Sequence, residues 1–152
     1  MADENTGNHG GDIHWSFWLI VGVTLLFNMM GVTNFIIQMD AATVASMPEV
    51  HRIIIENRPD WITAGFALAV FGGELGCLLL LFKQPVAFYL FIVSLVGALV
   101  TMAYTLGIGG SAHGSGIGPA EHIVGNLIQL IVTAFLIWYT LWVKRKGWIG
   151  RK

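Results

Sequence analysis

Polar side chains recur at helical spacing in two otherwise apolar segments, and these residues could bind a ligand. One stripe, with steps of four, three and four residues, comprises His122, Asn126, Gln129 and Thr133. A second stripe along one side of a helix comprises Thr24, Asn28, Gly31, Asn34 and Gln38. Amides and hydroxyls both donate and accept hydrogen bonds, as a sugar-like or other uncharged polar solute requires.

The two stripes predict a substrate-binding site between the first and the last apolar segment. Its candidate residues are Asn28, Asn34, Gln38, His122, Asn126 and Gln129. The alternative is that these side chains only join helices to one another, because polar contacts between membrane helices often do no more than that.

Glu74 is the only charged side chain deep within an apolar segment. An ionised carboxylate in a bilayer needs a partner, water or the interior of a bundle, and otherwise takes up a proton. Glu74 therefore predicts a proton-coupled or cation-coupled site, or an acid that contacts the substrate. The alternative is a protonated side chain that bonds to a neighbouring helix or reaches the membrane interface.

Other chemistry is not indicated. The formal net charge is −1, which gives no reason to expect a nucleic acid as partner. No Ser–His–Asp set, phosphate-binding loop or helical HExxH motif is present, so we expect no enzyme and no catalytic residues. The pair His9 and His14, or His113 with Glu121 and His122, offers too few regularly spaced ligands for a metal. No metal and no other cofactor is therefore expected.

The elements that must position these residues are membrane-spanning helices. Of the 152 residues, 55% are hydrophobic and 11% are charged, against about 25% charged in soluble proteins. Four apolar runs reach the length of about 20 residues that a spanning helix needs, at 15–39, 61–82, 85–106 and 121–143. The sequence predicts an all-α membrane protein, a four-helix transmembrane bundle whose polar sides face one another.

The connections and the ends of the chain carry their own signals. Ser46-Met47-Pro48-Glu49 matches a capping box, and helical spacing of apolar residues continues to Arg58-Pro59. We expect a short amphipathic helix here, in the first outside loop. The glycine-rich stretch 107–120 predicts a flexible loop, either a linker or a flap over a site. Residues 1–14 are expected to be a flexible tail, and residues 144–152 a basic tail.

Small residues recur every fourth position in the second span, at Gly65, Ala69 and Gly73. Small side chains let membrane helices approach closely, so these positions predict a helix-packing face. Besides the lipid bilayer, the expected partners are a second copy of the chain or other membrane proteins.

The distribution of basic residues predicts the orientation. One side of the membrane receives Lys83 together with the basic residues of 144–152, and the other side receives only Arg52 and Arg58. Cytoplasmic segments are enriched in Lys and Arg. Both termini are therefore predicted to be cytoplasmic.

Three stretches resemble a known family: Phe27-Asn28-Met29-Met30-Gly31-Val32, Met47-Pro48-Glu49 and the run from Pro59 to Gly73. These stretches of sequence are similar to those of small four-span bacterial inner-membrane proteins often labelled sugar transporters. The resemblance covers residues 15 to about 105 and implies a bacterial inner-membrane location and a transport function. It assigns no binding residue, and Glu74 departs from a pattern in which an apolar residue is more usual.

The leading interpretation is a transporter for a sugar-like, uncharged polar solute, with its site between the first and last spans. The alternative is an accessory or structural subunit of a larger membrane complex, bound through the small-residue face of the second span. A proton-conducting element centred on Glu74 is a third interpretation.

Overall fold

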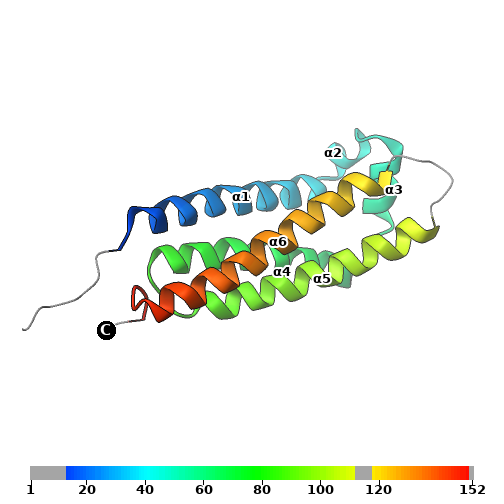
Figure 1. Cartoon of the computed structure of the whole chain (residues 1–152). Coiled ribbons are helices and arrows are strands. Elements are labelled where there is room, and N and C mark those ends of the chain that lie inside the picture. Colours follow the sequence, from blue (N-terminus) through cyan, green and yellow to red (C-terminus); the bar gives the residue numbers. More distant parts are fainter. Residues whose placement is uncertain (1–12, 112–117, 151–152) are drawn as a thin grey trace, which may run out of the picture.

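The computed structural model describes residues 13–111 and 118–150, and for residues 50, 108–111 and 118–122 it describes only the backbone. Within these ranges the regular structure is helical (Figure 1). The helices are α1 (Trp15–Met39), α2 (Ala41–Ala45), α3 (Glu49–Glu56), α4 (Asp60–Leu81), α5 (Ala87–Ser111) and α6 (Gly118–Arg145). Four of them, α1, α4, α5 and α6, are long and apolar enough to cross a membrane. The predicted all-α membrane bundle with a short helix in its first loop is confirmed.

The predicted capping box is wrong, although the helix after it forms. Pro48 is the N-cap of α3, and no side-chain hydrogen bond caps that helix. The Ser46 hydroxyl instead donates to the carbonyl oxygen of Thr43, at 2.7 Å. The reason is that a further short helix, α2, has Ser46 as its C-cap, and both the backbone amide and the hydroxyl of the serine donate to a carbonyl in the last turn of that helix.

Two other boundaries differ from expectation. α5 begins at Ala87, not at Pro85, because Lys83 turns the chain in the left-handed region (φ 59°). The Gln84 amide donates to the Leu79 carbonyl oxygen at 2.8 Å, which closes α4 with a Schellman turn. α5 also continues to Ser111, so the first residues of the glycine-rich stretch are helical. A helical glycine costs only about 1 kcal/mol relative to alanine. Residues 112–117 of that stretch, with His113, and residues 1–12, with His9, lie outside the described residues, and residues 118–120 already belong to α6.

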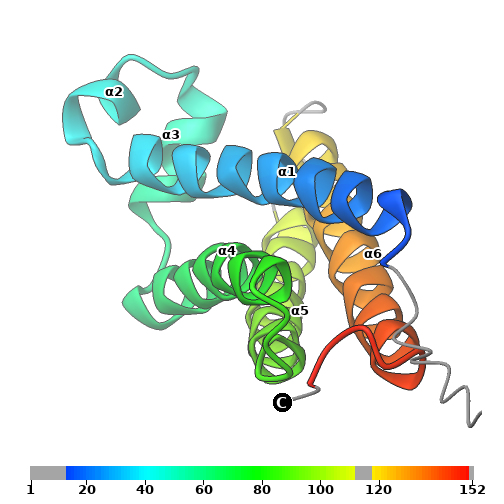
Figure 2. The same cartoon turned by 90° about the vertical axis from the view of Figure 1, so that its left-hand side faces the viewer.

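The spans pack in chain order. α1 lies against α4, α4 against α5 and α5 against α6, with the closest packing between α4 and α5 (Figures 1 and 2). Glycines make that contact possible, since a Cβ added to Gly97 would lie 2.7 Å from the Ala69 backbone nitrogen. Ser94 donates to the Ala69 carbonyl oxygen at 2.5 Å across the same contact.

The predicted small-residue face lies inside this packing. A Cβ on Gly65 would meet Val100 of α5 at 3.0 Å, and one on Gly73 would collide with Asn28 of α1. Ala69 is 2% exposed. The face is therefore filled by α1 and α5 of the same chain.

A cluster of buried apolar residues lies toward the end of the bundle where α1 begins and α6 ends, called here the terminal end. Its members are Phe17, Val21, Cys77, Leu80, Ala87, Phe91, Leu136, Tyr139, Val143 and Ile149. Phe17 of α1 stacks on Tyr139 of α6 with ring centroids 6.4 Å apart. Ile149, in the predicted basic tail, belongs to this core because Gly147 (φ 71°) turns the chain back after α6.

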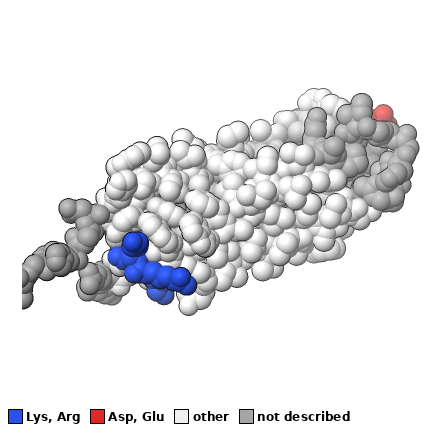
Figure 3. Space-filling model, in the orientation of Figure 1, with Lys and Arg blue, Asp and Glu red and all other residues white. Residues whose placement is uncertain are grey.

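The outside of the bundle suits lipid. Large apolar side chains are exposed along the spans, among them Leu26 (64%) and Ile131 (67%). In Figure 3 the visible Lys and Arg side chains gather near the terminal end, and the face of the flank seen in this view shows no charged side chain. The chain is a multi-pass membrane protein.

Candidate functional site

A cavity of about 430 Å³ lies in the half of the bundle next to α3, called here the α3 end. All four spans and α3 contribute to its wall. Its polar lining comprises Asn34, Gln38, Arg58, Thr101, Tyr104, Thr105, Asn126 and Gln129. The apolar lining includes Phe27, Met30, Ile54, Ile55, Ile62 and Phe66. Binding sites for small molecules have volumes of about 300–1,000 Å³ and this mixture of apolar wall and few polar groups.

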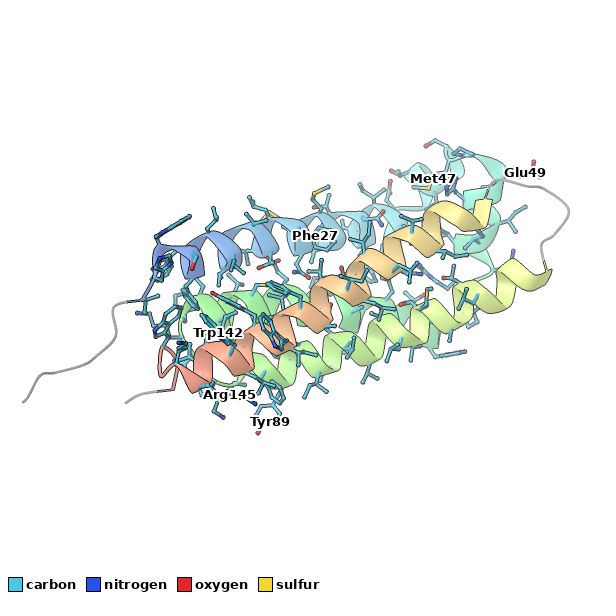
Figure 4. The ribbon with its side chains drawn as sticks, in the orientation of Figure 1. Phe27, Met47, Glu49, Tyr89, Trp142 and Arg145 are labelled. Carbon is cyan, nitrogen blue, oxygen red and sulfur yellow. The ribbon has the colours of Figure 1, made fainter. Side chains whose placement is uncertain are left out.

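The structure brings four of the six predicted site residues to this cavity. Asn34 and Gln38 reach it from α1, and Asn126 and Gln129 from α6. Asn28 lies outside the cavity lining, and the side chain of His122 lies outside the described residues. Figure 4 shows Phe27, another lining residue, in the middle of α1.

Asn28 joins helices beneath the cavity. It is 1% exposed, and its Nδ2 donates to the Thr24 carbonyl oxygen at 2.8 Å and to Cys77 Sγ at 3.5 Å. Its Oδ1 accepts from Gln129 Nε2 at 3.5 Å. Asn28 therefore connects α1, α4 and α6. For this residue the contacts agree with the alternative that the polar side chains join helices to one another.

The α6 amides are held from one side and open on the other. Asn126 Nδ2 donates to Thr105 Oγ1 of α5 at 3.0 Å. Gln129 Nε2 contacts Asn28 and also Thr133 Oγ1, at 3.5 Å. Across the described part of the chain, no hydrogen bond uses Asn126 Oδ1 or Gln129 Oε1. Each amide keeps an acceptor for a solute in the cavity that it lines.

Arg58 is a further cavity residue, one that the sequence analysis did not predict for the site. It lies two residues after the end of α3, and its Nη1 donates to Gln38 Oε1 of α1 at 2.8 Å. Its Nε donates to Thr63 Oγ1 at 3.2 Å, and its guanidinium carbon lies 5.4 Å from the centre of the Phe66 ring. The available signal was the position of a long cationic side chain just before a span, from where it can fold back over the first turns.

The guanidinium brings a positive charge to the cavity wall. Burial lowers the pKa of Arg58 below its ordinary value, but a guanidinium stays charged at neutral pH. Among the residues whose side chains the structure describes, the one ion pair between side chains joins Arg52 and Glu56, at 3.9 Å. No carboxylate among these described side chains pairs with Arg58.

The helix end beside Arg58 is fixed to the bundle. Tyr104 of α5 donates its hydroxyl to the Asn57 carbonyl oxygen at 3.1 Å. Gln38 Nε2 donates to Asn34 Oδ1 at 3.3 Å, one turn earlier on α1. Arg58 thus sits between two anchored neighbours, so its guanidinium is held at the wall of the cavity.

Glu74 is separate from this site. It lies on α4 toward Cys77 and does not line the cavity. Its Oε2 is buried and has no hydrogen-bond partner within the described residues. No hydrogen bond joins this carboxylate to the polar stripes of α1 and α6 among the described side chains.

Metal-ligating side chains do not gather in the described part of the chain, where no three His, Cys, Asp or Glu residues come together. His14 has a local role, since its Nδ1 accepts from the Ser16 backbone nitrogen at 3.3 Å and caps α1.

Comparison of the chain with protein-family models, with curated proteins and with solved structures finds no match. Function is therefore inferred from the cavity and from the membrane-spanning fold.

Proposed function

We propose that the protein binds a small polar solute in the cavity at the α3 end and transports it across a bacterial inner membrane. The observation that carries the proposal is the cavity of about 430 Å³, because four neutral amides from α1 and α6 line it together. Amides satisfy several hydroxyl groups of one solute, while the apolar wall packs against its carbon skeleton.

The charge distribution supports an orientation for this site. Lys83, Lys144, Arg145 and Lys146 belong to the terminal end, and the α3 end carries Arg52 and Arg58. If the more basic end is cytoplasmic, as is usual, both termini are inside and the cavity opens toward the outer face.

Three single substitutions test the solute site: Asn34→Leu, Asn126→Leu and Gln129→Leu. Each substitution removes hydrogen-bonding atoms from the cavity wall and replaces the amide with an apolar side chain of similar size. In proteoliposomes, we expect binding and uptake of a neutral hexose or polyol to fall about tenfold for each variant, since an unpaired polar group costs about 1–3 kcal/mol.

The matched control is Thr33→Val on α1. Thr33 donates to the Met29 carbonyl oxygen of its own helix at 2.9 Å and does not line the cavity. This variant should bind and transport like the unmodified protein. Unchanged binding and uptake in all three leucine variants would refute a solute site at this cavity.

The alternative of an accessory or structural subunit stays a prediction. The face proposed for its docking is filled, because Gly65, Ala69 and Gly73 of α4 lie against α1 and α5. A partner, or a second copy of the chain, would have to use another surface. Proton conduction through Glu74 also stays a prediction, and Glu74→Gln with unchanged proton flux would exclude it.

A further inference from the structure

Arg58 differs in kind from every other polar group at the cavity. The remaining polar lining consists of amides and hydroxyls, which are neutral. The guanidinium is charged, half-buried and unpaired by any carboxylate in the described residues. A buried charge without a partner is unfavourable, so the cavity favours a ligand that brings the opposite charge.

The contacts of Arg58 leave donors free for such a ligand. A guanidinium has five N–H donors, and protein atoms take up those on Nη1 and Nε that point to Gln38 and Thr63. Both acceptors are neutral oxygens. The remaining N–H groups belong to Nη1 and Nη2, the edge of the fork that binds carboxylates and phosphates.

The position of the guanidinium is set before a ligand arrives. Gln38 holds it from α1, Thr63 from α4, and the Phe66 ring lies against it at 5.4 Å. Little side-chain freedom remains to be lost on binding, which favours affinity.

We propose that the solute of this cavity carries an oxyanion, a carboxylate or a phosphate, that pairs with Arg58. This inference rests on the proposed function and makes its substrate class narrower. The anionic group lies at Arg58, and the hydroxylated remainder of the solute reaches Asn126 and Gln129 on the opposite wall. A polyhydroxy acid has this combination of groups.

The test compares gluconate with glucitol, which share a six-carbon polyhydroxy chain and differ in carboxylate against CH₂OH at one end. Binding of each is measured by calorimetry on the full chain in nanodiscs of zwitterionic lipid. We expect gluconate to bind at least tenfold more tightly than glucitol, because hydrogen bonds to a charged group are the stronger ones.

Three arginine variants assign the difference to Arg58. Arg58→Gln should remove the preference for gluconate, and Arg58→Lys should keep part of it, because lysine retains the charge without the fork. Arg52→Gln is the matched control, since Arg52 on α3 pairs with Glu56 and does not line the cavity. It should keep the full preference. Thermal unfolding of each variant shows whether the fold is intact.

A lipid is the other source of an oxyanion. Phosphatidylglycerol that copurifies with the unmodified protein and with Arg52→Gln, but not with Arg58→Gln, would support the anion site with a headgroup as its ligand.

Equal affinities for gluconate and glucitol, or a preference that survives Arg58→Gln, would overturn the inference and leave the solute site in place. Absence of binding by both compounds at millimolar concentration, without bound anionic lipid, would refute the anion site and the proposed solute site together.

Discussion

The two ends of the bundle are built from the same four spans, but their interiors are packed differently. At the terminal end the core is filled, and Phe17, Phe91 and Tyr139 are at most 4% exposed. At the α3 end the spans enclose a cavity of about 430 Å³. Residue size accounts for part of the difference, because Gly31 and Gly125 occupy wall positions there. A Cβ added to Gly125 would meet nothing within 4 Å.

Hydrogen bonding accounts for the rest. Polar side chains at the α3 end bond along the wall, as Asn126 does to Thr105 and Arg58 to Gln38. These directional bonds hold side chains back from the centre, whereas aromatic rings at the terminal end interlock across it. One framework of four helices therefore forms a filled core at one end and a cavity with polar groups in its wall at the other.

The largest difference between the two ends is expected when one aromatic ring is removed from each. Phe17→Ala should lower the free energy of unfolding by about 3–5 kcal/mol, because it opens a hole in a filled core. Phe27→Ala should cost less than about half of that, since Phe27 already borders a cavity. Denaturation in mixed detergent micelles measures both. Equal losses would show that the two ends are packed alike.

A smaller effect is expected where α4 and α5 support both ends. Gly97→Ala should destabilise the fold by about 1–3 kcal/mol, because the new Cβ would lie 2.7 Å from the Ala69 backbone nitrogen. The control is Gly22→Ala, where nothing lies within 4 Å of the added Cβ. That variant should be as stable as the unmodified protein or slightly more so. The same unfolding assay compares them.

The contact between Asn28 of α1 and Gly73 of α4 lies between the two ends, and its contribution to stability can be measured with a double variant. Gly73→Ala places a methyl group against the Asn28 side chain, and Asn28→Ala removes a bridge to Cys77 and Gln129. Each should cost about 1–2 kcal/mol. The double variant should cost about 1 kcal/mol less than the sum, since the methyl then fills space left by the amide. Strict additivity would show that the two sites are independent.

The smallest effect concerns pH, and it should be confined to the α3 end. Asp40 caps α2 by accepting hydrogen bonds from the hydroxyl and the backbone amide of Thr43, and these bonds lower its pKa below the ordinary 3.8. Because the pKa of Asp40 is lower in the folded protein than in the unfolded chain, its charged cap stabilises α2 fully at pH values above the ordinary pKa. This stabilisation is lost as the pH falls through the lowered pKa of the folded protein. Hydrogen-exchange protection of the Thr43 amide should therefore drop only below about pH 4.

Asp40→Asn is the control for this titration, because asparagine caps a helix without titrating. Its Thr43 amide should keep the same protection across the pH range. The Trp148 amide, which bonds to the Val143 carbonyl oxygen at the terminal end, should show no such loss. A similar acid transition at both amides would contradict a local effect of Asp40.

The spans were predictable because the bilayer imposes both their length and their composition. α1 has the predicted bounds, and the other spans differ by a few residues at their ends. The polar stripes also indicated the facing sides of α1 and α6, which is why Asn34 and Gln129 meet at one cavity. Periodicity carries this information, since it records which side of a helix is turned inward.

The parts that could not be predicted depend on contacts between distant residues. From the sequence, Arg58 was predicted only to be a positive charge in the outside loop. Its hydrogen bond to Gln38 of α1 holds it at the cavity. Asn28 shares a stripe with the lining residues, yet burial against Gly73 gives it a structural role. Ile149 packs into the core only because Gly147 reverses the chain. None of these contacts is encoded in local spacing.

The chain-order packing of the spans has a consequence for biosynthesis. Each span can dock on one that has already been inserted, α4 on α1, α5 on α4 and α6 on α5. Contacts between the first and the last span, such as Phe17 with Tyr139 and Asn28 with Gln129, must wait for α6 to leave the ribosome. The cavity has no complete wall until then, so a nascent chain gains its binding site in the last step of its assembly.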